Sequence, residues 1–126
     1  MSFTKDLVVG GMWKGTANAI LGTSTTLAGV TALAGGANSA STPQLSSVVN
    51  VVSVCATGGD SVRIPLGELG DEVFIRNNGA ASCNVLPQAG GAFNLGSADA
   101  AFAVGISKSA HFKNIGGTNW IGLLGA

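Results

Sequence analysis

The sequence predicts an all-β protein. We expect an antiparallel β-sandwich or jelly-roll-like domain over residues 46–126, preceded by an extended N-terminal arm over residues 1–45. Short β-branched and apolar runs follow residue 46, with turn residues roughly every eight to twelve positions, as in sandwiches and barrels. The first 45 residues are instead rich in Gly, Thr and Ser, a composition that disfavours long helices.

The arm is expected to be extended and to become ordered on a partner. Residues 30–45, VTALAGGANSASTPQL, read as a long surface connection. The pattern also allows a strand around residues 27–33 within the arm. Thr42 followed by Pro43 could open a helical turn through Leu45, because Pro is tolerated at the first helical position.

The first strands of the β-domain are predicted at residues 48–56 (VVNVVSVCA) and 61–66 (SVRIPL). Both are rich in β-branched residues, and the TGGD between them supplies turn residues. We therefore expect these two strands to form a hairpin.

A second hairpin is expected from residues 71–77 and 82–87, because Asn78-Gly79 between them tolerates the positive φ angles of a tight turn. In its first strand Val73 and Ile75 share one face, whereas Glu72, Phe74 and Arg76 take the other. Neither face is wholly polar, which indicates that both faces of the sheet are at least partly covered.

Three more strands are predicted at residues 101–106, 109–115 and 119–124, with Gly116 and Gly117 separating the last two. In SAHFK, alternation places Ala110 and Phe112 on one face and His111 and Lys113 on the other. Residues 88–100 read as a loop with a short apolar centre.

Composition predicts self-association. The 126 residues include six basic and six acidic side chains, 10% of the chain, whereas about 25% is usual. Because interfaces are depleted of charge at their centres, burial against sister subunits would remove this poorly charged surface from water. Zero net charge and scattered basic residues argue against a nucleic-acid partner.

A membrane partner is not expected either. The uncharged stretch 16–37 holds five Thr and four Gly. It therefore has too few large apolar residues for a spanning helix. A signal peptide also fits poorly, since Asp6 stands beside Lys5 and the apolar run starts late.

The residues that usually carry chemistry are few, so no enzyme activity, cofactor or metal is expected. His111 is the single histidine, and its spacing from Cys55 and Cys83 matches no zinc signature. We expect both cysteines to be small buried hydrophobes, although one disulfide remains open. Asp60 and Asp71 each follow glycine before a strand and are expected to shape turns. The GGMWKG motif at 10–15 lacks the spacing of a phosphate-binding loop.

Three segments together resemble small structural proteins of tailed bacteriophages. They are NVVSVCATGGDSVRIP, GDEVFIRNNGAASCNVLPQAGGAFN and AFAVGISKSAHFKNI, followed by Trp120. The resemblance spans residues 50–124 and implies an antiparallel β-domain that commonly assembles as a trimer, as in head decoration (cement) proteins, head fibres and some tail components. It implies no catalytic residues, and partners among sister subunits, the major capsid protein or other virion proteins. The expected location is the virion, assembled in the host cytoplasm.

Aromatic and large apolar residues are the expected contacts with partners. The candidates are Trp13, Leu27, Val30, Leu33 and Trp120, with core packing favoured for Trp120 and left equally open for Trp13. A tail or fibre component and a carbohydrate-binding β-sandwich remain as alternatives, the latter poor in aromatic platforms because the chain has two Trp and no Tyr.

Overall fold

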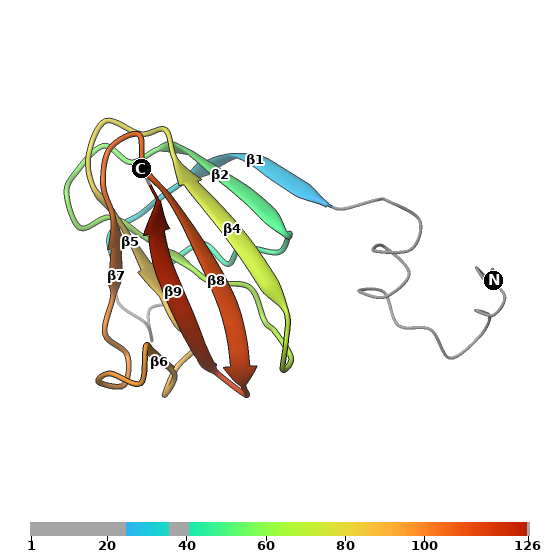
Figure 1. Cartoon of the computed structure of the whole chain (residues 1–126). Coiled ribbons are helices and arrows are strands. Elements are labelled where there is room, and N and C mark those ends of the chain that lie inside the picture. Colours follow the sequence, from blue (N-terminus) through green and yellow to red (C-terminus); the bar gives the residue numbers. More distant parts are fainter. Residues whose placement is uncertain (1–24, 36–40, 126) are drawn as a thin grey trace, which may run out of the picture.

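The computed structural model describes residues 25–35 and 41–125, and every regular element among them is a β-strand. The prediction of an all-β protein is confirmed (Figure 1). The strands are β1 (Thr26–Thr31), β2 (Val49–Val54), β3 (Ser61–Arg63), β4 (Glu72–Asn77), β5 (Cys83–Leu86), β6 (Ala92–Phe93), β7 (Phe102–Val104), β8 (Ser109–Gly116) and β9 (Asn119–Gly125). Each strand predicted in the β-domain is present, although several are shorter than expected.

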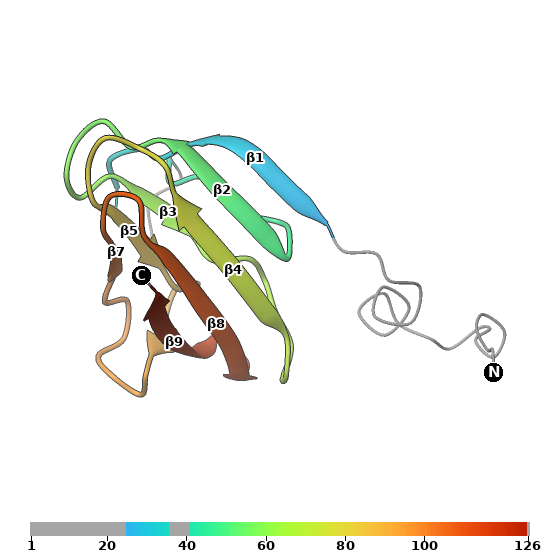
Figure 2. The same cartoon turned by 45° about the horizontal axis from the view of Figure 1, so that its top comes forward.

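The strands form two sheets. A six-stranded sheet has the order β1-β2-β4-β8-β9-β6, and a three-stranded sheet has the order β3-β5-β7 (Figure 2). One core joins them, because its buried side chains come from both. The members include Val52, Val73, Ile75, Phe112 and Trp120 from the large sheet and Val62, Cys83, Val85 and Val104 from the small one.

The chain winds between the two sheets as a coil. Strands β2, β3, β4 and β5 belong alternately to the large and the small sheet, so β2 lies parallel to β4 and β3 parallel to β5. Strand β1 is parallel to β2, and a bridge from Gln44 to Arg63 is also parallel. The arrangement resembles the turns of a β-solenoid, and the expectation of a wholly antiparallel domain is wrong.

Neither of the two predicted hairpins forms, because each intervening turn carries the chain to the opposite sheet. Between β4 and β5, Asn77 accepts a hydrogen bond from the amide of Gly79 (2.8 Å) and donates to the carbonyl of Ala81 (2.8 Å). A side chain at Gly79 would overlap Cys55, whose Cα would lie 2.9 Å from the added Cβ. The Asn-Gly pair thus shapes a close crossing over the end of β2. Antiparallel order is kept by β4 with β8, β8 with β9, and β5 with β7.

Part of the expected N-terminal arm belongs to the folded body. The strand allowed around 27–33 is present as β1, although its register with β2 shifts twice. Ala32 and Leu45 are 2% and 1% exposed within the core, and the backbone of Leu33 bonds to that of Ser61. Residues 41–45 therefore run alongside β3 of the small sheet instead of forming a surface connection. The rest of the arm, residues 1–24 and 36–40, lies outside the described residues.

One part of the core is a cluster of three phenylalanine rings, and these rings can pack only because a glycine lies beside them. The rings of Phe93, Phe102 and Phe112 pack with centroids 5.0 to 5.8 Å apart. A Cβ at Gly122 would lie 2.8 Å from Phe112 and 2.9 Å from Phe102. Position 122 on β9 consequently admits only a residue without a side chain unless both rings move.

Candidate functional site

The outer face of the six-stranded sheet, on the side away from the small sheet, is the main surface that the fold leaves uncovered. Along β4, Val73 and Ile75 are buried, whereas Glu72 and Phe74 are exposed and Arg76 is half-buried. Along β8, Ala110 and Phe112 are buried and Lys113 is exposed. The alternation predicted for both strands is confirmed. Within the described chain the outward side chains of β4 and β8 are not covered by another element.

An apolar row crosses this outer face. Backbone register places Val49, Phe74, His111 and Leu123 side by side on β2, β4, β8 and β9, and we call these four residues the apolar row. Phe74 is 43% exposed and Leu123 is 65% exposed. Half-buried Val51 and Ile121 flank the row on the same face. Exposed aromatic and aliphatic groups next to one another on a sheet are typical of a surface that contacts another protein.

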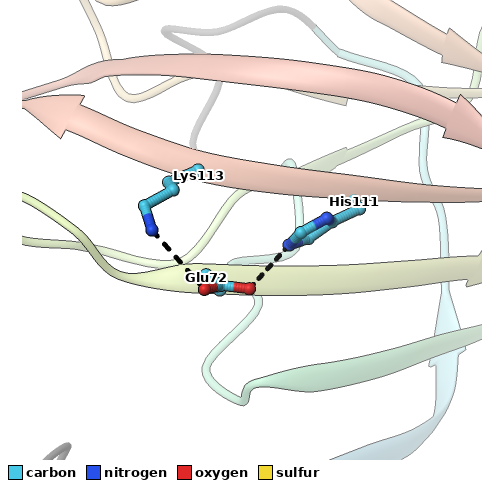
Figure 3. Close-up of polar contacts among 3 residues, drawn as sticks. All are labelled: Glu72, His111 and Lys113. Atoms are coloured by element: carbon cyan, nitrogen blue, oxygen red, sulfur yellow. Dashed lines mark hydrogen bonds and ion pairs between the residues drawn. The ribbon is translucent and has the colours of Figure 1, made fainter.

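Glu72, His111 and Lys113 form a small polar cluster that shares His111 with the row. Glu72 accepts a hydrogen bond from Nε2 of His111 at 2.9 Å, and its other carboxylate oxygen lies 3.6 Å from Nζ of Lys113 (Figure 3). The hydrogen bond from His111, with the nearby Lys113 charge, lowers the pKa of Glu72. The imidazole also stacks on the ring of Phe74, with centroids 4.4 Å apart and planes within 3°.

This cluster holds His111 in place by two contacts. Its Nε2 is engaged by a carboxylate, and one face of the ring is covered by a phenyl group. The side chain is 38% exposed, so the ring is also partly open to solvent. The arrangement joins β4 to β8 across the strands.

Both cysteines are buried as free thiols, as predicted. Sγ of Cys55 lies 3.4 Å from the carbonyl oxygen of Ser82, and Sγ of Cys83 lies 3.7 Å from that of Asn84. Burial raises the pKa of the Cys55 thiol and raises the pKa of Cys83 to about 12. Because the thiolate is the reactive and metal-binding form, these groups are chemically inert near neutral pH.

The predicted turn roles of the two aspartates are confirmed. Asp60 accepts from the amide of Thr57 at 3.2 Å, and Asp71 accepts from the amide of Glu68 at 2.8 Å. In the part of the chain that the structure describes, no three His, Cys, Asp or Glu side chains gather closely enough to hold a metal ion. Residues 25–35 and 41–125 also include no helix with the length and hydropathy needed to cross a bilayer.

The partner-contact residues chosen from the sequence occupy different environments. Trp120 is 1% exposed and packs in the core, so its ring is not accessible to a partner. Leu27 and Val30 are partly buried against the core, and Leu33 is 46% exposed. Trp13 lies outside the described residues.

Sequence reasoning did not select Phe74 and Leu123 as contact residues. The available signal was Phe74 itself, an aromatic residue on the otherwise charged face of its strand. That signal led only to the expectation that both sheet faces are partly covered. The described chain leaves this face exposed, so any cover must come from elsewhere.

Comparison of the chain with protein families, with curated protein sequences and with solved structures gave no match.

Proposed function

We propose that this protein is a structural component of a tailed-bacteriophage virion, a homotrimeric head decoration protein that binds the capsid surface and stabilises it. The observation that supports the proposal most directly is the exposed apolar row on the outer face of the large sheet. A row of this kind serves contact between proteins. The resemblance of residues 50–124 to phage structural proteins supplies the virion context, and a tail or fibre position is the alternative within it.

The scarcity of charge supports an assembled state. Six acidic and six basic residues in 126 must serve a surface on which Leu66, Leu69, Leu95 and Leu123 are each more than 60% exposed. Association removes such groups from water, at roughly 25 cal/mol for each Å² of apolar surface buried. Copies with zero net charge also do not repel one another.

The chemistry of the site supports a non-catalytic role without cofactor. The thiols are protonated near neutral pH, and the single histidine is engaged by Glu72 and Phe74. The burial of Trp120 removes one of two tryptophan platforms, which counts against a carbohydrate-binding role.

We propose that residues 1–24 contact the capsid. They precede β1 directly, and a trimer would carry three such segments, each raising the effective concentration of the others at the capsid surface. Attachment through three linked contacts suits a protein that must hold capsomers together under the outward pressure of packaged DNA.

The test is co-sedimentation of the purified protein with capsids of its virus, comparing the full chain with a variant lacking residues 1–24. This deletion leaves β1 and Ala32 in place, whereas a longer one would remove them. We expect the truncated protein to keep the circular dichroism spectrum and the number of subunits of the full-length protein but to lose capsid binding. Undiminished binding by the truncated protein would refute the role of residues 1–24, and no binding by the full chain would refute capsid decoration.

A further inference from the structure

We propose that the apolar row is where this chain binds further copies of itself, with the same face of each copy meeting at the contact. The inference rests on the proposed function in one respect, that the protein is a self-associating structural subunit. It goes further by naming the surface and its occupant. The major capsid protein then binds elsewhere on the molecule.

The outer face is large enough for a stable contact. The six strands, which are two to eight residues long, lie about 4.8 Å apart and rise roughly 3.3 Å per residue, so they cover on the order of 550 Å² in projection. Protruding side chains add to this, which brings the accessible area toward the ~800 Å² per partner of a standard interface. Phe74, 43% exposed, lies on β4 in the middle of the sheet, and Leu123, 65% exposed, lies on β9 next to its edge.

The charged groups on the face already have partners within their own subunit, so a second protein that covers them leaves no charge unpaired. The carboxylate of Glu72 is shared by His111 and Lys113. The guanidinium of Arg76 donates to Oδ1 of Asn78 and to the carbonyl of Ser107, both at 2.8 Å. A buried charge is costly chiefly when it is unpaired. The face therefore combines apolar contact with internally satisfied polar groups.

A second copy is the occupant that the charges favour. The face carries both signs, with Glu72 beside Lys113 at one end of β4 and Arg76 at the other. A partner of strongly basic or acidic character would meet like charge at one of these ends. The same face of another copy presents the identical mixture, and apolar groups that match in kind and number. The count of copies then follows from the measured mass.

The test uses the full chain and measures absolute mass by size-exclusion chromatography with light scattering over a range of concentrations. The variant is Leu123→Glu, which places a charge in the row at a position exposed enough not to disturb the core. Leu66→Glu is the matched control, since Leu66 is 79% exposed in the loop between β3 and β4. We expect Leu123→Glu to weaken association at least about 30-fold, as loss of a strong interface contact does, while Leu66→Glu keeps the mass of the wild-type assembly.

A second measurement does not depend on weakening the assembly. Leu123→Cys introduces an exposed thiol, whereas Cys55 and Cys83 are buried. With a mild oxidant we expect disulfide-linked dimers from Leu123→Cys and not from Leu66→Cys.

The outcomes separate the two proposals. An oligomeric wild type whose mass is unchanged by Leu123→Glu would overturn the assignment of this face and leave the structural function standing. A monomeric wild type that still binds capsids would overturn both this inference and the trimeric state, and would leave capsid decoration standing. If residues 1–24 of the same chain cover the face, deleting them would increase the number of subunits in the assembly. This result would also overturn the inference.

Discussion

Three buried asparagines use their side-chain amides to complete turns that the backbone cannot complete. Asn50, Asn77 and Asn114 are each at most 1% exposed. Asn114 accepts from the amide of Gly116 at 2.7 Å and donates to the carbonyl of Gly117 at 3.0 Å, which closes the turn between β8 and β9. A buried polar group without a partner is costly. Each of these side chains therefore satisfies its own amide and also provides partners for backbone groups of the loop around it.

Asn77 has the most extensive of these contacts and is the residue whose loss we expect to matter most. Its amide donates to the carbonyls of Ala81 (2.8 Å) and Val104 (2.9 Å) and its oxygen accepts from Gly79. Asn77→Ala leaves these groups unpaired and should lower the free energy of unfolding by roughly 2–4 kcal/mol. Urea denaturation measures the loss.

Asn78→Ala is the matched control for that substitution. Asn78 is exposed, and its side chain accepts only from Nε of Arg76 at the surface. We expect a change of about 0.5 kcal/mol or less. Equal losses in the two variants would show that the buried amide of Asn77 contributes nothing special to the crossing loop.

At the scale of the elements, the pairing of β4 with β8 is reinforced by side chains on the outer face. Glu72 lies directly opposite Lys113 and diagonal to His111, and Phe74 lies opposite His111. Cross-strand pairs of opposite charge and of stacked rings each stabilise a sheet modestly. The two strands are consequently joined by the core on one face and by this cluster on the other.

The lowered pKa of Glu72 makes this contribution depend on pH. The folded-state pKa lies below the ordinary value of 4.5, so the carboxylate stabilises the fold above pH 4.5, and the effect is lost as pH falls through the folded-state pKa. Because the side chain is 47% exposed, we expect wild type to be more stable than Glu72→Gln by less than about 1 kcal/mol near pH 6, and this difference should shrink as the pH falls below 4.5.

Denaturant titrations at several pH values would measure this difference. Glu68→Gln, in the loop before β4, serves as the control and should show no such loss. A gap between wild type and Glu72→Gln that persisted unchanged at pH 3 would exclude the carboxylate as its source.

At the scale of the whole molecule, the coil of β1 to β5 makes residues distant in sequence depend on one another. Strand β1 forms the edge of the large sheet, and Ala32 and Leu33 connect it to β3 through the core and a backbone bridge. The folded body accordingly includes residues 25–35, well before residue 46.

Two truncations test this boundary. Removing residues 1–24 should leave the melting temperature within a few degrees of that of the full chain. Removing residues 1–35 also deletes β1 and Ala32 and uncovers β2, so we expect a fall in the melting temperature of at least about 8 °C, as loss of 2 kcal/mol or more produces in a domain of this size. Equal melting temperatures for the two would show that β1 is not part of the cooperative unit.

The sequence by itself determined the all-β class, the positions of most strands, the inward and outward residues of β4 and β8, the buried thiols and the aspartate turns. All of these are local, because side chains alternate across any strand and turn residues act on their own neighbours. Only the tertiary structure decided which strands pair. Turns after Cys55 and Asn77 cross between sheets instead of reversing within one, which makes β2 and β4 parallel neighbours and exposes the apolar row. That choice depends on close approaches such as Gly79 against Cys55, between residues whose proximity no local pattern records.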